Sequence, residues 1–311
     1  MNARKINLIV LIIFIMIIIN GCENGFDIKG IREEARYEEE PDIIVKLSDG
    51  EEKSMKLEEY ISGVIAGEMK DDWPENAYAA QAILARTFAL RYLEENETEV
   101  ISGSHRFAQE YKPDQITSEI REATEKTRGE VVFHNDSYIK GWFHSSAGGY
   151  TTSAKVGLAY EKEEPPYVKS VESPDDEAPD DVKNWQSEFN REEIETALDE
   201  LGVEIGELEN IEIVDKDETG RVIDFNIIGS EDTETVKGAN LRIELDSKKL
   251  KSTKIDELVK EDGNYIFSGS GYGHGVGLSQ WGAYSMALDG RSPEDIVRHY
   301  FDNIEIVSVY D

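Results

Sequence analysis

Residues 57–69 read LEEYISGVIAGEM, and this stretch decides how the folded part of the chain begins. Apolar side chains recur at positions 57, 60, 61, 64 and 65, which is the spacing of one face of an α-helix. The following Asp71-Asp72-Trp73-Pro74 ends that helix. Pro74 suits the first turn of a second, Ala-rich helix, which we expect to run to about Glu94.

Glu68 falls on the apolar stripe of the first helix and is a candidate general acid. An ionised carboxylate is costly in apolar surroundings, so we expect its pKa to be raised. A carboxylic acid that is still protonated near neutral pH is what general-acid cleavage of a glycosidic bond requires. The alternative is a purely structural carboxylate that pairs with Arg86 or Arg91.

Residues 271–283 read GYGHGVGLSQWGA, with glycine at every second position from 271 to 277. Because glycine loses so much conformational entropy on folding, this pattern indicates backbone that runs close to a ligand or to another chain segment. His274 is displayed between two of the glycines, and Ser279 suits the N-cap of a helix. A tight packing turn is an equally good explanation at this stage.

Residues 143–151 read FHSSAGGYT and place a histidine beside two hydroxyl groups. A Ser-His hydrolase that uses Ser145 and His144 is one interpretation, but neighbouring residues on a strand point to opposite faces. A hydrogen-bonded scaffold histidine is the alternative that we favour. The five histidines show no HExxH spacing and the chain has one cysteine, so we expect neither a metal nor another cofactor.

The N-terminal 22 residues have the pattern of a signal peptide. An apolar run from Leu8 to Ile19 would rise only about 18 Å as a helix, too short for the hydrocarbon core of a bilayer. It ends at Ile19-Asn20-Gly21-Cys22, which resembles a lipoprotein signal-peptidase site and predicts lipidation at Cys22. The alternative is a short uncleaved anchor. Both place the rest of the chain outside the cytoplasmic membrane.

The charge balance excludes some partners. The chain has 311 residues, with 66 Asp and Glu against 33 Lys and Arg, and a formal net charge of −33. Nucleic acid is a poor partner for such a surface, because phosphate binding needs clustered basic side chains. Apolar residues make up 39% of the chain, enough for a substantial core.

The distribution of elements predicts an α+β fold, in which a helical cleft region packs on mixed or antiparallel β structure and a small α/β segment is inserted. We expect a first strand over 43–47, a hairpin around Asn135-Asp136, and helices over 279–288 and 292–300. In the insert we expect a helix over 191–201 and strands over 211–214, 222–228 and 241–245. The predicted divisions are a signal peptide (1–22), an acidic tether (23–42), a core (43–171 with 263–311) and an inserted subdomain (172–262).

Three blocks together resemble the stage II sporulation protein D and amidase-enhancer family. They are residues 57–89 with their Trp73-Pro74, residues 144–149, and residues 271–283 followed by a helix to Tyr300. The resemblance covers nearly everything from about Ile43 to Val307. It implies a lytic transglycosylase of peptidoglycan that acts on glycan strands stripped of stem peptides, with Glu68 at the position of the catalytic glutamate.

The resemblance also guides which side chains we expect beside the substrate. These substrate-binding candidates are Gln81, Arg86, Gln109, Tyr111, His144, Ser145, Ser146, His274, Ser279, Gln280 and Trp281. Some family members bind zinc through the block after the second helix, which here reads GSHRFAQEY over 103–111. Ala108 stands where a cysteine often occurs, so we predict no zinc. A non-catalytic wall-binding module that assists a separate cell-wall amidase is the rival function.

Overall fold

The computed structural model describes residues 37–47, 49–104 and 109–311. The predicted signal peptide and Cys22 lie outside the described residues, as does most of the predicted tether. Two units are distinguished, residues 1–38 and 39–311, and the second is described here. The predicted α+β class is confirmed, because this unit combines helices with several small sheets. None of the helices within the described ranges is long and apolar enough to cross a bilayer.

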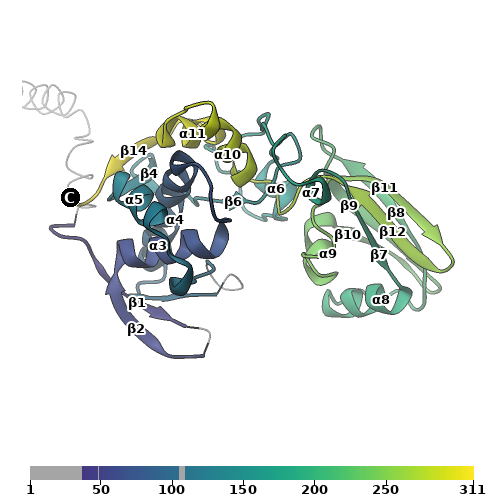
Figure 1. The fold of residues 1–311 in the computed structure, drawn as a ribbon. Helices are drawn as coiled ribbons and strands as arrows, with labels where there is room; N and C mark the ends of the chain where they lie inside the picture. Colours follow the sequence, from purple (N-terminus) through teal and green to yellow (C-terminus); the bar gives the residue numbers. More distant parts are fainter. Residues whose placement is uncertain (1–36, 48, 105–108) are drawn as a thin grey trace, which may run out of the picture. The chain divides into compact units, whose positions relative to one another are not determined.

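Helix α4 (Glu75–Glu95) is the centre of the helical part (Figure 1), and it packs against four other helices. Its neighbours are α3 (Leu57–Glu68), α5 (Ser118–Lys126), α10 (Gln280–Leu288) and α11 (Pro293–Tyr300). The many alanines of α4 are buried, which lets these helices approach closely. On α3, each fully buried aliphatic side chain contributes about 1.5–3 kcal/mol. The predicted helices therefore form because their apolar faces meet.

Small sheets border the helices. Strands β1 (Asp42–Lys46), β2 (Glu52–Lys56) and β3 (Val100–Ser102) form one sheet in the order β2-β1-β3. A second sheet has the order β14-β4-β5 and joins the C-terminal strand β14 (Glu305–Ser308) to β4 (Glu130–His134) and β5 (Ser137–Tyr138). The predicted hairpin is confirmed at β4 and β5, where Asn135 and Asp136 both have positive φ, as a tight two-residue turn requires. Its second strand is shorter than expected.

Two short strands bring together the second and third sequence blocks. Strand β6 (Phe143–His144) runs parallel to β13 (Leu278–Ser279), and an isolated bridge joins Ser146 to Tyr272. The chain also forms the short 3-10 helix η1 (Pro113–Gln115) before these strands and the short helices α6 (Ala154–Gly157) and α7 (Asp180–Lys183) after β6. The pairing of β6 with β13 places His144 next to Ser279.

The inserted part has its own apolar core. One sheet has the order β10-β9-β8 and the other β11-β12-β7, and α8 (Arg191–Glu200) and α9 (Gly238–Glu244) accompany them (Figure 1). The strands are β7 (Trp185–Phe189), β8 (Leu208–Lys216), β9 (Val222–Gly229), β10 (Thr233–Lys237), β11 (Ile255–Glu261) and β12 (Asn264–Gly269). The buried cluster runs from Trp185 to Phe267, and thus includes side chains of β12.

One predicted strand of the insert is wrong. Residues 241–245 alternate between apolar and polar side chains, but they belong to helix α9 and its C-cap. Leu241 and Leu245 are buried on one face, whereas Ile243 between them is exposed. The spacing of four residues between the two leucines, not the alternation, sets which side chains meet the core.

Candidate active site

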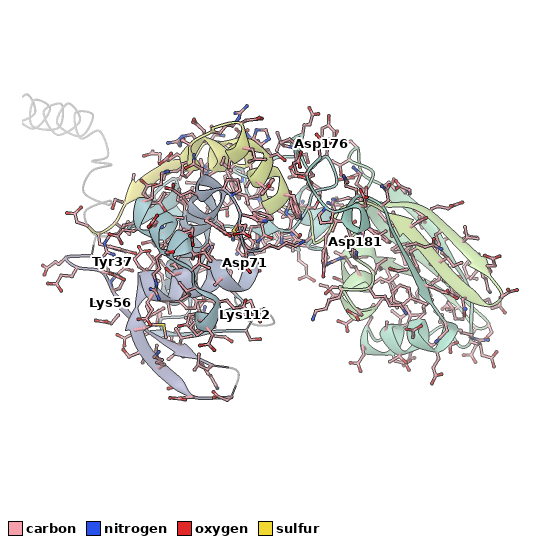
Figure 2. The ribbon with its side chains drawn as sticks, in the orientation of Figure 1. Tyr37, Lys56, Asp71, Lys112, Asp176 and Asp181 are labelled. Carbon is pink, nitrogen blue, oxygen red and sulfur yellow. The ribbon has the colours of Figure 1, made fainter. Side chains whose placement is uncertain are left out.

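Glu68 is the last residue of helix α3, at the end that leads to Asp71 (Figure 2). The predicted stripe is observed, since Leu57, Ile61 and Val64 are fully buried, while Glu68 itself is half-buried. Its carboxylate Oε1 accepts the backbone N–H of Glu110 at 2.8 Å. Helix α3 therefore packs its apolar stripe in the core and places the Glu68 carboxylate at a partly exposed position.

Two glycines of α3 allow the segment after β3 to lie on the helix. A Cβ atom at Gly63 would stand 2.2 Å from the ring of Tyr111, and one at Gly67 would stand 2.3 Å from the carbonyl oxygen of Glu110. Since neither position has space for a side chain, the segment can approach closely enough for the Glu110 N–H to reach Glu68. Tyr111 is buried and stacks on Tyr60, with ring centroids 5.6 Å apart. Tyr111 is thus packed against the helix.

Gln109 precedes this contact and is buried. Its Oε1 accepts the Tyr60 hydroxyl at 3.5 Å, and its Nε2 has no hydrogen-bond partner within the described part of the chain. Residues 105–108, which belong to the segment predicted to lack zinc, lie outside the described residues. Among the residues that the structure describes, no group of three or more His, Cys, Asp and Glu side chains is arranged to hold a metal ion.

An aromatic group follows the C-terminal end of α3. Trp73 contacts Trp281 and Tyr284, with ring centroids 4.7 and 5.1 Å apart. The Lys70 ammonium lies 5.3 Å from the centroid of the Trp281 ring. The backbone N–H of Trp281 donates to the backbone carbonyl of Ser145 at 3.0 Å. These contacts connect the Glu68 end of α3 with the segment that carries His144 and Ser145.

His144 and His274 lie side by side, with ring centroids 5.4 Å apart. Nδ1 of His144 donates to the carbonyl of Val276 at 3.2 Å, and Nδ1 of His274 accepts the Val276 N–H at 3.0 Å, so the two neutral rings carry their protons on different nitrogens. Burial, then the neighbouring His274 and Arg221, holds the pKa of His144 well below its ordinary value. Burial, then Arg242 and Arg221, lowers the pKa of His274 to about 3. Both imidazoles are therefore neutral at physiological pH.

A carboxylate that the sequence did not single out, Asp175, organises the hydroxyl groups. Its Oδ2 accepts the Ser146 hydroxyl and the Gly148 N–H, both at 2.8 Å, and its Oδ1 accepts the hydroxyls of Ser173 and Ser279 at 2.7 and 2.8 Å. Ser146 and Ser279 are buried in this arrangement. They were expected to contact substrate, but the structure uses them to connect the two blocks. In the sequence, Asp175 lies in the acidic stretch SPDDEAPDD (173–181) at the predicted start of the insert, and this composition indicates a boundary and not a site.

The alternating glycines are explained by packing within the chain. All four have positive φ, and a Cβ atom would stand 2.8 Å from Cβ of His144 at Gly273, 2.3 Å from Cζ of Arg221 at Gly275, and 2.2 Å from the Trp142 carbonyl oxygen at Gly277. The loop therefore needs glycine to fit between chain segments, and its composition does not require a ligand. Ser279 is the N-cap of α10, as predicted, and Gln280 and Trp281 in the first turn are mostly buried.

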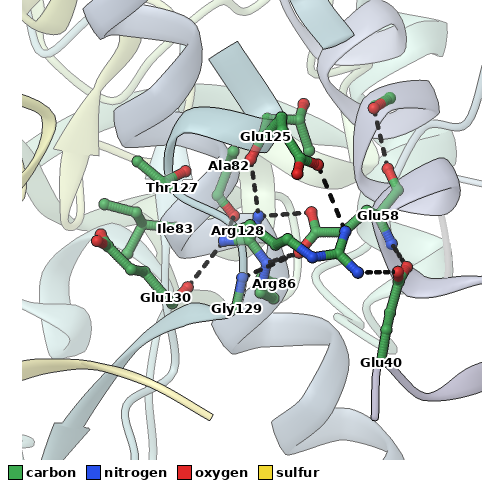
Figure 3. Close-up of polar contacts among 12 residues, drawn as sticks. Glu40, Glu58, Ala82, Ile83, Arg86, Glu125, Thr127, Arg128, Gly129 and Glu130 are labelled. Carbon is green, nitrogen blue, oxygen red and sulfur yellow. Dashed lines mark hydrogen bonds and ion pairs between the residues drawn. The ribbon is translucent and has the colours of Figure 1, made fainter. Parts of the chain in front are cut away.

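Arg86 was expected to contact substrate, and its position contradicts this expectation. It is fully buried and forms a two-point ion pair with Glu58, in which Nε and Nη2 lie 2.8 and 2.6 Å from the carboxylate oxygens (Figure 3). Arg91 pairs with Glu95 at 2.5 Å. The two arginines considered as structural partners of Glu68 therefore pair with Glu58 and Glu95. Gln81, another candidate, is fully buried, and neither polar atom of its amide has a hydrogen-bond partner within the described ranges.

Comparison with known proteins identifies the family. A family model described as "Stage II sporulation protein" matches residues 50–134. The stage II sporulation protein D of Bacillus subtilis (strain 168) is 31% identical over 272 residues, which cover 82% of this chain and 75% of the relative. This chain belongs to the stage II sporulation protein D family. The predicted resemblance is therefore confirmed.

Other relatives of this family member extend the comparison. The amidase enhancer of Bacillus subtilis (strain 168) is 26% identical over 293 residues, which cover 80% of this chain and 40% of the relative. An uncharacterized protein of Brachyspira hyodysenteriae is 27% identical over 258 residues, covering 81% of this chain and 67% of the relative. A second family model, described as a domain of unknown function (DUF8618), matches residues 168–277. The names of the relatives support a role related to sporulation and the cell wall.

Proposed function

We propose that this family member is a lytic transglycosylase that cleaves the bond between N-acetylmuramic acid and N-acetylglucosamine in glycan strands stripped of stem peptides. The observation that carries the proposal is the placement of Glu68. It is half-buried at the end of a buried helix, held by the Glu110 N–H at 2.8 Å, and followed by the Trp73 and Trp281 aromatic group.

In the proposed reaction, the Glu68 carboxylic acid protonates the glycosidic oxygen as the bond to C1 of the muramic sugar breaks. The carboxylate then removes the proton of the C6 hydroxyl, whose oxygen bonds to C1 and closes a 1,6-anhydro ring. No water is consumed, and one carboxyl group serves both steps, unlike the pair that most hydrolases need. The half-buried Ser145 hydroxyl and His274 are suited to hydrogen bonding with sugar hydroxyl and N-acetyl groups. His144, also expected beside the substrate, is buried, with Nδ1 bonded to the Val276 carbonyl and Nε2 enclosed.

The test is incubation of the full chain with peptide-stripped glycan strands and mass spectrometry of the products. We expect ends that carry 1,6-anhydromuramic acid, and about a 10²–10⁴-fold lower rate in Glu68→Gln, the usual contribution of a general acid. The control is Glu59→Gln on the same helix, since Glu59 is exposed. If glycan strands incubated with the wild-type protein carry no anhydro ends, the proposal is disproved.

A second candidate is a non-catalytic module that binds the wall and assists an amidase. The similarity to a protein named amidase enhancer favours it. It predicts that Glu68→Gln still binds glycan and still stimulates the amidase. It also predicts that neither wild type nor Glu68→Gln produces anhydro ends. A Ser-His hydrolase has less support, because Nδ1 of His144 is bonded to Val276 and, among the contacts of the described residues, no hydrogen bond joins its ring to Ser145.

We further propose that the protein acts on the outer face of the cytoplasmic membrane, attached through lipidated Cys22 or through an uncleaved N-terminal segment. The apolar run that ends at Cys22 supports this location. Metabolic labelling with a fatty acid would test it. Label that is present in wild-type protein and lost in Cys22→Ala is expected if the cysteine is lipidated.

A further inference from the structure

Arg221 is one of the side chains through which the inserted part of the chain contacts the candidate site, with Asp175 and Lys254 among the others. A tight turn fixes the backbone of Arg221, because Oδ1 of Asp217 accepts the N–H groups of Thr219 and Arg221 at 3.0 and 2.9 Å. The next residue, Val222, begins β9 and donates to the carbonyl of Thr253 at 2.8 Å. The direction of the Arg221 side chain is therefore set by the insert.

The guanidinium of Arg221 contacts both segments that carry the histidines. It is fully buried, and Nη2 donates to the carbonyl of Ala147 at 2.8 Å. The Gly275 backbone lies directly on it, since a Cβ atom there would stand 2.3 Å from Cζ. Ala147 closely follows His144, and Gly275 directly follows His274. One side chain thus touches the loops on both sides of the histidine pair.

Stability of the fold does not explain why this cation is buried. Nε and Nη1 of Arg221 are buried and lack a hydrogen-bond partner within the described residues. Burial lowers the pKa of the guanidinium to about 10, although Asp217 acts in the opposite direction. A buried charge with unpaired donors is costly, and its replacement by an apolar side chain of similar volume is often neutral or stabilising. Such a residue calls for another explanation.

We propose that Arg221 is a positioning residue, through which the insert holds the loops of His144 and His274 in the arrangement that the candidate active site requires. This rests on the proposed function, because the arrangement matters only if the site acts on glycan. In this arrangement of the two loops, the imidazoles are different tautomers: His144 donates from Nδ1, and His274 accepts at Nδ1. The positive charge also favours neutral forms of both rings.

The test compares Arg221→Met with the wild-type full chain in three measurements: thermal unfolding, imidazole ¹⁵N signals at pH 7, and steady-state kinetics on stripped glycan. We expect the unfolding temperature to stay the same or rise, the signals of His144 and His274 to shift, and kcat to fall at least tenfold with a smaller change in KM. Arg221→Lys can still donate to Ala147 and is expected to recover part of kcat.

The matched control is Arg242→Met. Arg242 is also a buried cation of the insert and also lowers the pKa of His274, but its Nε and Nη2 donate to the carbonyls of Lys251 and Ser247, within the insert. The variant therefore separates the effect of charge on His274 from the contact that Arg221 makes with the two loops. We expect it to keep kcat. Unchanged imidazole signals in Arg221→Met, an equal loss of kcat in Arg242→Met, or unfolding of Arg221→Met at the assay temperature would each overturn the proposal. If wild-type protein does not cleave glycan, the proposed function fails, and the imidazole signals alone decide the role of Arg221.

Discussion

Two of the three glutamates of helix α3 have opposite surroundings: Glu58 lies near its first residue and Glu68 is its last. Glu58 is buried and receives four hydrogen bonds, from Nε and Nη2 of Arg86, the Gly129 N–H and the Tyr310 hydroxyl, at 2.8, 2.6, 3.1 and 2.6 Å. Glu68 is half-buried and receives the Glu110 N–H. The same side chain on one helix is thus enclosed at one end and partly open to solvent at the other.

This difference in surroundings indicates a structural role for Glu58 and makes Glu68 the candidate for proton transfer. Glu58 joins α3 to α4, to the residue before β4 and to the end of the chain, and so fixes the helix that presents Glu68. The Arg86 guanidinium and two further donors surround the Glu58 carboxylate and hold it as an anion. A carboxyl that exchanges protons with a ligand needs the partly open position of Glu68.

Removal of the Glu58 charge should have the largest effect on stability. In Glu58→Gln the Arg86 guanidinium stays buried without its counter-charge, and breaking such a pair typically costs about 3–5 kcal/mol. We expect this loss in urea unfolding monitored by circular dichroism. Glu68→Gln is expected to change the free energy of unfolding by less than about 1 kcal/mol, as is usual for a substitution away from the core. Similar losses in both variants would remove the distinction between the two glutamates.

Acidic pH should lower the stability of the folded protein, because it protonates Glu58. Burial opposes the charge of Glu58, but the charge and hydrogen bonds of Arg86, with those of Tyr310 and Gly129, hold its pKa below the ordinary value. The stabilisation is therefore complete above the pKa of the unfolded chain and is lost as the pH falls through the lower, folded pKa. The difference in urea midpoint between wild type and Glu58→Gln should shrink across this acid range. A constant difference would show that the pKa of Glu58 is the same in the folded and the unfolded chain.

Tyr310 offers a milder change to the same site. Its hydroxyl donates to Glu58 at 2.6 Å, and burial, followed by the opposing effects of Arg86 and Glu58, leaves the pKa of this phenol above its ordinary value. Hydrogen bonds to charged groups contribute about 1.5–3 kcal/mol. Tyr310→Phe, which keeps the ring, should lose about this amount in urea unfolding while the rate on glycan is retained. A large fall in rate without loss of stability would connect Tyr310 directly to the candidate active site.

Local patterns predicted the elements better than the partners of polar groups. The apolar period of α3 and the Asn135-Asp136 turn are local properties, and both correspond to observed elements. The role of Arg86 depends on Glu58 in another helix, and that of Ser279 on Asp175, more than a hundred residues earlier in the chain. Such pairings arise from tertiary packing. For the same reason, the alternation over 241–245 was insufficient to distinguish a strand from helix α9.

The smallest effect is expected for an exposed ion pair, which joins Lys56, just before α3, to Asp42. Their charged atoms lie 3.0 Å apart, but the side chains are 48% and 65% exposed. Water screens this pair and fixing two mobile side chains costs entropy, so it should contribute only about 0–1 kcal/mol. Lys56→Met should therefore shift the urea midpoint slightly, and the shift should vanish at 1 M salt, whereas the Glu58→Gln loss should persist because its partners are buried. A Lys56→Met loss as large as that of Glu58→Gln would mean that burial does not distinguish the two ion pairs.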